Sequence, residues 1–183
     1  MINTKIMDAK GIKRSIERIA YEILEHNGGA DDMVIIGIRT RGVFLAERVA
    51  KVIKRIEKTA PPVGAVDITM YRDDVQIKLD QPIIQKTDLS FSIDDKIVIL
   101  VDDVLYTGRT VRAALNELSD YGRTRCIQLA VLIDRGHREL PICADYTAIK
   151  LQTFTDENVI VNLKEHDDED SVILQQSNGG EVK

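Results

Sequence analysis

The sequence predicts a single α/β domain, spanning residues 1–183, built on a mainly parallel twisted sheet with helices on both faces. Short apolar runs typical of buried parallel strands alternate with amphipathic helical segments. A length of 183 residues fits one domain, and the chain contains no interdomain linker, internal repeat or low-complexity tract. With 44% hydrophobic and 30% charged residues, the composition excludes disordered and fibrous classes of protein.

The first half of the chain predicts a helix followed by a strand–loop–helix unit. Isoleucines at helical spacing predict an amphipathic helix over Asp8–Asn27, which two glycines end. The apolar run Met33–Ile38 predicts a buried strand, followed by a charged loop at 39–42. A second helix is expected up to about Lys58, because Pro61 and Pro62 prevent its continuation.

A long polar stretch separates this unit from the next one. The alternation over Val66–Met70 predicts a half-exposed strand. The polar residues from Tyr71 to about Asp95 then predict a long hairpin that acts as a lid.

The second half predicts another strand–loop–helix unit and a terminal hairpin. Lys96–Val101 is expected to be the central strand, with a helix from about Arg109 to Tyr121. Cys126–Ile133 predicts a further buried strand, which ends in the charged loop 134–138. Strands at 158–163 and 171–174 would form a β-hairpin.

This arrangement brings three loops to one edge of the sheet. Ligands of open parallel sheets bind beyond the carboxyl ends of the strands. The loops 39–42, 102–110 and 134–138 all follow predicted strands. We therefore expect the functional site to lie where these loops converge.

Several classes of function are excluded by composition. No apolar run approaches the roughly 18 residues of a membrane span, and the amino terminus lacks a signal-type apolar core, so a cytoplasmic protein without a membrane partner is expected. Cys126 and Cys143 lack metal-binding spacing, which argues against zinc and favours buried free thiols. A net charge of −5 argues against a surface that coats nucleic acid, although a local basic face remains possible. With five tyrosines, three phenylalanines and no tryptophan, a base-stacking platform is not expected.

The strongest motif runs from Val98 to Thr110. A buried strand delivers the adjacent carboxylates Asp102 and Asp103 to the sheet edge, and the segment Thr107–Thr110 opens a helix. Backbone N–H groups at a helix start hold phosphate, whereas paired acids suit ribose hydroxyls or a phosphate-bound Mg²⁺. The motif predicts a site for a phosphorylated sugar; the alternative is an ordinary strand–turn–helix with an exposed acidic pair.

The motif matches the phosphoribosyl diphosphate motif of type I phosphoribosyltransferases. Together with Asp67–Asp74 and Leu129–Pro141, it resembles the PyrR family of bifunctional pyrimidine operon attenuation regulators and uracil phosphoribosyltransferases. The similarity covers nearly the whole chain. It implies the type I phosphoribosyltransferase fold, with a flexible lid hairpin and a carboxyl-terminal β-hairpin.

The resemblance implies roles for individual residues. The catalytic pair Asp102 and Asp103 would engage the ribose hydroxyls, and phosphoribosyl diphosphate would bring Mg²⁺ near them without a direct protein metal site. The residues implied to bind phosphoribosyl diphosphate at its 5′-phosphate are Val104, Leu105, Tyr106, Thr107, Gly108, Arg109 and Thr110. Those implied to form the diphosphate loop are Arg39, Thr40, Arg41 and Gly42, for which an ordinary positively charged helix-start loop is the alternative. Tyr71 and Arg72 would belong to the lid, and Arg135, Val159 and Ile160 to the pyrimidine site.

The resemblance also implies partners: uracil, UMP and UTP, a pyr messenger RNA leader hairpin, and further copies of the chain in a dimer or larger homo-oligomer. RNA contacts are implied for Arg14, Arg18, His137 and Arg138. Glu17, Tyr21 and residues 148–157 depart from the family pattern. A phosphoribosyltransferase or nucleotide-binding paralogue with weak or altered RNA binding is therefore the alternative, and the first helix could equally present a solvated mixed-charge face.

Two further groups carry no predicted catalytic role. His26 and His166 are expected to be surface histidines. The acidic run 165–170 could hold a cation, but a solvated turn is favoured because consecutive carboxylates do not converge on one ion.

Overall fold

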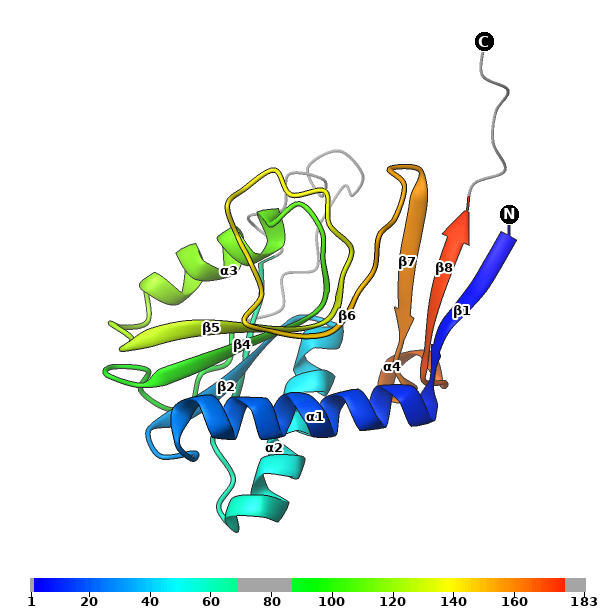
Figure 1. Cartoon of the computed structure of the whole chain (residues 1–183). Coiled ribbons are helices and arrows are strands. Elements are labelled where there is room, and N and C mark those ends of the chain that lie inside the picture. Colours follow the sequence, from blue (N-terminus) through cyan, green and yellow to red (C-terminus); the bar gives the residue numbers. More distant parts are fainter. Residues whose placement is uncertain (1, 69–86, 177–183) are drawn as a thin grey trace.

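The computed structural model describes residues 2–68 and 87–176. A five-stranded parallel sheet, ordered β3-β2-β4-β5-β6, is accompanied by a three-stranded antiparallel sheet ordered β1-β8-β7 (Figure 1). The parallel sheet contains β2 (Met33–Ile38), β3 (Val63–Val66), β4 (Ile97–Leu105), β5 (Cys126–Asp134) and β6 (Tyr146–Lys150). The antiparallel sheet contains β1 (Ile2–Asp8), β7 (Glu157–Asn162) and β8 (Ser171–Gln176). The helices are α1 (Ala9–Asn27), α2 (Arg41–Glu57), α3 (Arg109–Ser119) and α4 (Lys164–Asp167).

Helices cover the two faces of the parallel sheet, as predicted. Strand β4 is buried on both sides: Ile99 and Val101 pack into the cluster that includes α1 and α2, whereas Val98 and Leu100 pack into the cluster that includes α3. Figure 1 shows α1 and α2 on one side of the sheet and α3 on the other. Because both faces of the sheet are covered by helices, the sequences of its strands are continuous apolar runs and do not alternate between apolar and polar residues.

The predicted first helix is confirmed together with its ends. The Asp8 carboxylate caps it by accepting a hydrogen bond from the Gly11 backbone N–H at 2.7 Å. Gly28 ends it in the left-handed conformation, with φ at 69°. On the buried face lie isoleucines at helical spacing, among them Ile12, Ile16 and Ile19.

Two strand boundaries differ from the sequence prediction. Of the strand predicted at Val66–Met70, residues 69–70 lie outside the described part of the chain; the observed strand is Val63–Val66, which pairs with Ile35–Ile38 of β2. Strand β4 continues to Leu105, so Asp102 and Asp103 lie within the strand rather than in a loop after it. This longer β4 is supported by its pairing with β5, which continues to Leu105 opposite Asp134.

The predicted lid falls largely outside the described residues, which exclude 69–86 and therefore Tyr71 and Arg72. Of the rest of the predicted stretch, residues 87–95 form no extended strand. Asp88 makes a single bridge to Ala65, and Ile93 is buried in the α3 side of the core.

The predicted carboxyl-terminal hairpin is confirmed as β7 and β8, in which Ile160 lies opposite Ile173. Sequence analysis missed its third strand, β1, in which Thr4 pairs with Leu174. Of the side chains of β1, Met7 alone is buried, so the strand carries almost no hydrophobic alternation. Strand β6 was also missed. The antiparallel sheet stands beside the carboxyl ends of the parallel strands (Figure 1).

In the described part of the chain, no helix has the length and apolar character needed to span a membrane.

Candidate active site

The carboxylates of Asp102 and Asp103 are fixed by the backbone that follows each of them. The N–H of Asp103 donates to Oδ1 of Asp102 at 2.9 Å, and the N–H of Val104 donates to Oδ1 of Asp103 at 2.8 Å. Asp102 is only 6% exposed, and Asp103 is half-buried. The structure thus holds two oriented acids at the carboxyl end of the central strand.

A turn at Gly108 leads from β4 into α3. Gly108 has φ at 92°, a conformation that favours glycine, and it stands at the amino-terminal cap of α3. A Cβ added there would lie 3.3 Å from Cδ1 of Ile142 and 3.4 Å from Cβ of Leu140. The capping residue Gly108 has no side chain, and the N–H of Arg109 donates to Oγ1 of Thr107 at 3.4 Å. The start of α3 also directs backbone N–H groups and its positive dipole end outward, where an anion can bind.

The loop predicted at 39–42 is shorter than expected, because α2 begins at Arg41. The start of α2 packs tightly against two strands. A Cβ added to Gly42 would lie 2.4 Å from the backbone O of Val101 in β4, and one added to Gly37 in β2 would lie 2.4 Å from Cα of Val43 in α2. The peptide bond between Arg39 and Thr40 is cis. The two glycines therefore permit the start of α2 to lie directly beside the acidic pair.

Arg41 makes a bidentate ion pair with Asp167 of α4. Its Nε donates to Oδ2 at 3.0 Å and its Nη2 donates to Oδ1 at 2.7 Å. These hydrogen bonds raise the pKa of Arg41, with a smaller contribution from the charge of Asp103, and they lower the pKa of Asp167. Arg41 is thus electrostatically coupled both to the acidic pair and to the run 165–170.

Most residues of the run 165–170 are exposed, which agrees with the predicted solvated turn, but three of its carboxylates form ion pairs that were not predicted. Besides the pair formed by Asp167, Arg48 of α2 donates to Glu165 at 2.9 Å and to Asp170 at 2.7 Å. The hydrogen bond from Arg48 lowers the pKa of Glu165. These ion pairs could not be predicted from the sequence, because the paired residues are more than a hundred positions apart in the chain.

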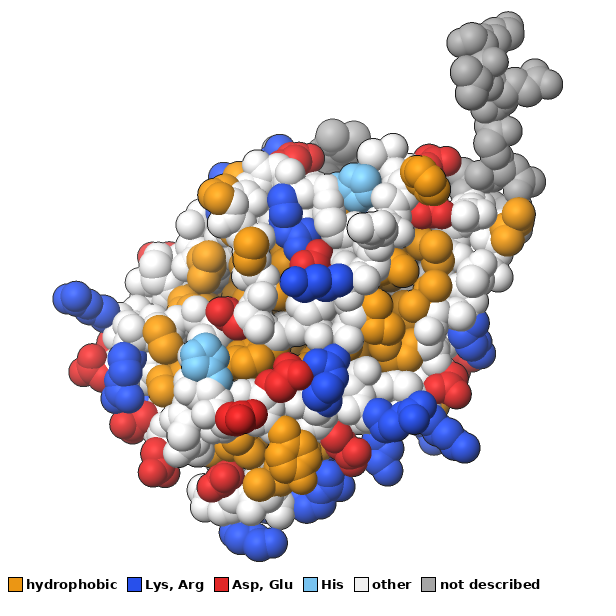
Figure 2. Space-filling model, viewed as in Figure 1, with side chains coloured by type: hydrophobic (Ala, Val, Ile, Leu, Met, Phe, Trp, Pro, Cys, Tyr) orange, Lys and Arg blue, Asp and Glu red, His pale blue; other side chains and the backbone are white. Residues whose placement is uncertain are grey.

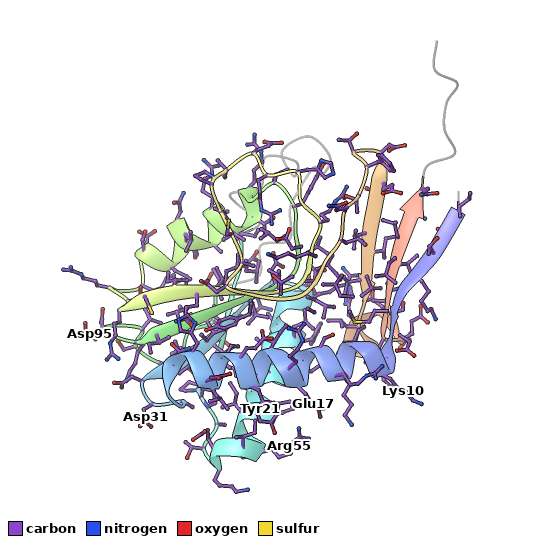
Figure 3. All side chains as sticks on the ribbon, viewed as in Figure 1. Lys10, Glu17, Tyr21, Asp31, Arg55 and Asp95 are labelled. Carbon is purple, nitrogen blue, oxygen red and sulfur yellow. The ribbon has the colours of Figure 1, made fainter. Side chains whose placement is uncertain are left out.

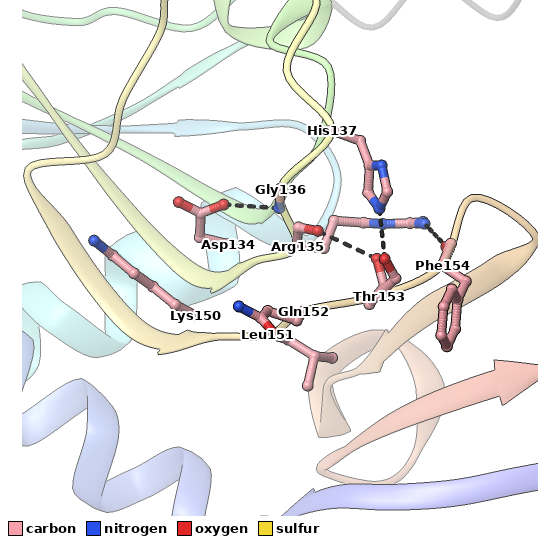
Figure 4. A pocket seen from close by; sticks show the side chains of 9 residues that line it. All are labelled: Asp134, Arg135, Gly136, His137, Lys150, Leu151, Gln152, Thr153 and Phe154. Carbon is pink, nitrogen blue, oxygen red and sulfur yellow. Dashed lines mark hydrogen bonds between the residues drawn. The ribbon is translucent and has the colours of Figure 1, made fainter.

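An open cleft of about 810 Å³ lies between the loops that follow β5 and β6. It is lined by Asp134, Arg135, Gly136, His137, Lys150, Leu151, Gln152, Thr153 and Phe154 (Figure 4). Nε2 of His137 lies 2.7 Å from the backbone O of Thr153, and the Thr153 hydroxyl donates to the backbone O of Arg135 at 3.2 Å. These contacts hold the two walls of the cleft together.

Arg135 supports this cleft from below its surface. The side chain is buried and donates through Nη2 to the backbone O of Glu157 at 2.7 Å and of Phe154 at 3.3 Å. Its guanidinium carbon lies 4.1 Å from the centre of the Tyr106 ring. Tyr106 therefore connects the cleft to the acidic pair and the α3 start.

Val159 and Ile160, the other residues expected at the pyrimidine site, lie in β7, opposite Leu174 and Ile173 of β8. They are outside the lining of the cleft. The nearby contact from Arg135 to Glu157 brings the amino end of their strand to the cleft.

Arg138, expected at an RNA surface, is turned into the fold. It pairs with the Asp134 carboxylate and donates to backbone oxygens of Tyr106 at 2.6 Å, Gly136 at 3.0 Å and Ile142 at 3.0 Å. Its side chain is 20% exposed. Arg138 thus joins the loops after β4 and β5, whereas the neighbouring His137 is exposed beside Tyr106.

Arg14 and Arg18 lie on the exposed side of α1. Arg18 pairs with Glu22 at 2.6 Å and donates to the backbone oxygens of Thr147 and Ala148 in β6. Glu17 pairs with Arg55 of α2 at 3.0 Å, and Tyr21 is 56% exposed on the same helix (Figure 3). Acidic and basic side chains are interspersed over this face, as Figure 2 shows, which agrees with the mixed-charge alternative.

Both histidines without a predicted role, His26 and His166, are exposed as expected. Both cysteines are free, but Cys143 is exposed and Cys126 is only half-buried, so the expected burial was wrong. Cys143 lies in the segment between β5 and β6, outside helices and strands. Within residues 2–68 and 87–176, no three His, Cys, Asp or Glu side chains are grouped to hold a metal ion.

Comparisons with known proteins identify the family. The model of the phosphoribosyl transferase domain matches residues 3–169. A bifunctional protein PyrR from Thermoanaerobacter sp. (strain X514) is 53% identical over 175 residues, which cover 96% of this chain and 98% of the relative. One from Alkaliphilus metalliredigens is 56% identical and covers 94% of each chain.

Solved structures of low sequence identity show the same fold. A hypoxanthine phosphoribosyltransferase from Staphylococcus aureus superposes with a TM-score of 0.70 at 20% identity, covering 96% of this chain and 93% of that one. The enzyme of the same name from Trypanosoma cruzi gives a TM-score of 0.70 at 15% identity, covering 94% and 96%. The type I phosphoribosyltransferase fold predicted from the motif is confirmed. With relatives about half identical over nearly its whole length and a phosphoribosyl transferase domain over most of it, the chain belongs to the PyrR family.

Proposed function

We propose that this protein transfers a phosphoribosyl group from phosphoribosyl diphosphate to uracil, giving UMP and diphosphate, and that it regulates attenuation of the pyr operon by binding messenger RNA. The observation that carries the enzymatic part is the segment 102–110. It places two fixed carboxylates and the open start of α3 side by side at the carboxyl end of β4. A polyol and a phosphate can therefore be bound by one continuous piece of chain.

In this proposal, Asp102 and Asp103 bind the ribose hydroxyls. The 5′-phosphate lies at the start of α3, where Thr107, Gly108, Arg109 and Thr110 surround it with backbone N–H groups and hydroxyls. Val104, Leu105 and Tyr106 connect these two parts. Gly108 is needed because a side chain would be strained at φ 92° and would press on Ile142 and Leu140.

The diphosphate would lie against Arg39, Thr40, Arg41 and Gly42. The donor set fits Mg²⁺ brought by the substrate, since Mg²⁺ is commonly held by one or two carboxylates plus substrate phosphates. The ion would be carried by the substrate and would lie near Asp102 and Asp103, which engage the ribose hydroxyls. When bound, Mg²⁺ would neutralise charge on the departing diphosphate.

Uracil would occupy the cleft beside Arg135, near the amino end of β7, the strand that contains Val159 and Ile160. The cleft and the acidic pair are joined by Tyr106, whose ring underlies Arg135 at 4.1 Å. A base in the cleft could thus meet C1 of a ribose held by Asp102 and Asp103.

Catalysis then needs no covalent nucleophile. As the bond from C1 to diphosphate breaks, positive charge develops on the ribose, and the two carboxylates stabilise it. Arg41 stabilises the negative charge of the leaving group. Tyr71, Arg72 and the surrounding segment would close over the substrates and exclude water.

The regulatory activity would use the exposed face of α1 and the loop after β5. Arg14, Arg18 and His137 are exposed there, whereas Arg138 would act by holding this loop in shape. UMP or UTP in the active site would alter RNA affinity. We further propose a cytoplasmic protein that assembles as a dimer or larger homo-oligomer.

A second candidate is a phosphoribosyltransferase or nucleotide-binding paralogue with weak or altered RNA binding. Two observations favour it: Glu17 places a carboxylate among the arginines of α1, and Arg138 is engaged within the fold. Negative charge on an RNA-facing surface repels phosphates.

Two measurements test the proposal. Formation of labelled UMP from uracil and phosphoribosyl diphosphate tests the enzyme, and its absence at saturating substrate would refute that part. Filter binding of a pyrimidine-leader hairpin, with and without UMP, tests the regulator. Glu17→Thr should strengthen this binding and Arg18→Ala should weaken it across a salt series; equal affinity for both variants and the parent chain would favour the paralogue.

A further inference from the structure

The acidic turn, residues 165–170, faces one side of α2. Arg41 and Arg48 lie about two helical turns apart on that side of α2 and both reach the turn. Arg41 pairs with Asp167, whereas Arg48 pairs with Glu165 and Asp170. Of these two arginines, Arg41 belongs to the proposed diphosphate loop.

The position of Asp167 is fixed by the backbone of its own turn as well as by Arg41. Its Oδ2 accepts a hydrogen bond from the Leu163 backbone N–H at 2.9 Å, and its own N–H donates to the Leu163 backbone O at 2.7 Å. The carboxylate uses both oxygens on Nε and Nη2 of Arg41. The guanidinium is therefore fixed in direction while its other N–H groups point elsewhere.

The pair has two opposing consequences for a diphosphate ligand. Fixing the guanidinium lowers the entropy lost when the ligand binds. The negative charge of Asp167 also offsets the positive charge of Arg41 and repels phosphate oxygens nearby. Because both side chains are partly shielded, at 31% and 17% exposure, solvent screens this repulsion only in part.

A leaving group that carries several negative charges must still be released after each transfer, and product release limits many enzymes. We propose that Asp167 is a positioning residue that orients Arg41 and limits how tightly Arg41 holds diphosphate. The inference rests on the proposed function, in which Arg41 contacts that group.

The test compares variants of the full chain by calorimetry with inorganic pyrophosphate and Mg²⁺. Asp167→Asn removes the charge and keeps the shape, and we expect it to tighten pyrophosphate binding by at least about threefold, because the charge repulsion exceeds the loss of orientation. UMP affinity should stay unchanged, since its phosphate would bind at α3. Glu165→Gln removes the same charge from the same turn beside Arg48, and it should leave pyrophosphate affinity unchanged.

A double-mutant cycle with Arg41→Gln assigns the effect. Arg41→Gln should weaken pyrophosphate binding. In that background Asp167→Asn should tighten binding less than it does in the parent chain, because only the direct repulsion by Asp167 is then removed. If Arg41→Gln leaves binding intact, the proposed diphosphate loop is wrong and the inference fails with it. If Arg41→Gln weakens binding but Asp167→Asn does not tighten it, the proposed function stands and the inference alone is rejected. A parallel loss of UMP affinity in Asp167→Asn would mean that Asp167 acts on the whole fold, which also rejects it.

Discussion

The sugar-phosphate half and the base half of the candidate site are built in different ways. The former is the continuous segment 102–110, and each carboxylate is fixed by the peptide group immediately after it. The latter joins the loops after β5 and β6, through contacts such as Arg135 to Glu157 and His137 to Thr153. Local hydrogen bonds make the first half a sequence motif, whereas the second depends on how distant segments pack.

Tyr106 lies at the boundary between the two halves. By sequence it belongs to the phosphate-binding segment, but its ring packs under Arg135 and edge-on to His137. A residue can thus belong to one half by position and to the other by contact. Substitutions in each half should therefore affect different kinetic constants.

The largest effect is expected for Asp103→Asn, which removes a charge from the sugar-phosphate half. The transfer rate should fall at least about tenfold, since one carboxylate stabilises a charged transition state by about 1.4 kcal/mol or more. Initial rates at saturating uracil and phosphoribosyl diphosphate measure it. Glu25→Gln, which changes an exposed carboxylate of α1, is the control. An unchanged rate in Asp103→Asn would remove this residue from catalysis.

Gly108→Val should weaken the binding of UMP and of phosphoribosyl diphosphate, the two ligands that share a 5′-phosphate. The left-handed backbone disfavours valine by about 1–2 kcal/mol, and its side chain would press on Ile142 and displace the turn. We expect the Kd of UMP and of phosphoribosyl diphosphate to rise about tenfold in parallel. Calorimetry that showed retained UMP affinity would place the phosphate elsewhere.

Tyr106→Leu tests whether Tyr106 acts in the base half or in the sugar-phosphate half. It removes the ring under Arg135, an interaction of about 1 kcal/mol, so the KM for uracil should rise about fivefold while that for phosphoribosyl diphosphate changes less. Tyr106→Phe keeps the ring and should resemble the parent chain. If only the KM for phosphoribosyl diphosphate rises, Tyr106 acts in the sugar-phosphate half and the prediction is wrong.

The smallest effect concerns the pH dependence of stability and the acidic turn, residues 165–170, which pairs with α2. Hydrogen bonds from Arg48 and Arg41 lower the pKa of Glu165 and Asp167 in the folded protein. Their stabilisation is present above the ordinary carboxyl pKa of about 4 and is lost as the pH falls through the lowered values. Melting temperatures of Glu165→Gln should be slightly lower at neutral pH and depend less on pH below about 4. Parallel curves for variant and parent would contradict this.

The sequence was sufficient for the elements with strong local signals. The isoleucine spacing and the glycines at its carboxyl end predicted α1, and the apolar runs predicted β2, β4 and β5. The sugar-phosphate segment was predictable because one stretch of chain contains its acids, its glycine and its helix start. Strand β1 was missed because Met7 is its single buried side chain, and its other residues show no pattern that separates a strand from a tail.

By itself, the sequence determined the parallel α/β architecture and the chemistry of a phosphorylated sugar site, since periodicity and a continuous motif report local backbone preferences. The tertiary structure alone decided the partners of the charged side chains. It joined Arg41 to Asp167 and turned Arg138 inward, where Arg138 binds backbone oxygens of the loop after β4 and of its own loop. Ion pairs and buried guanidinium contacts depend on which segments meet in space, and a guanidinium is compatible with many partners. For that reason, an arginine in the sequence indicates a positive charge but does not determine whether it faces a ligand or the fold.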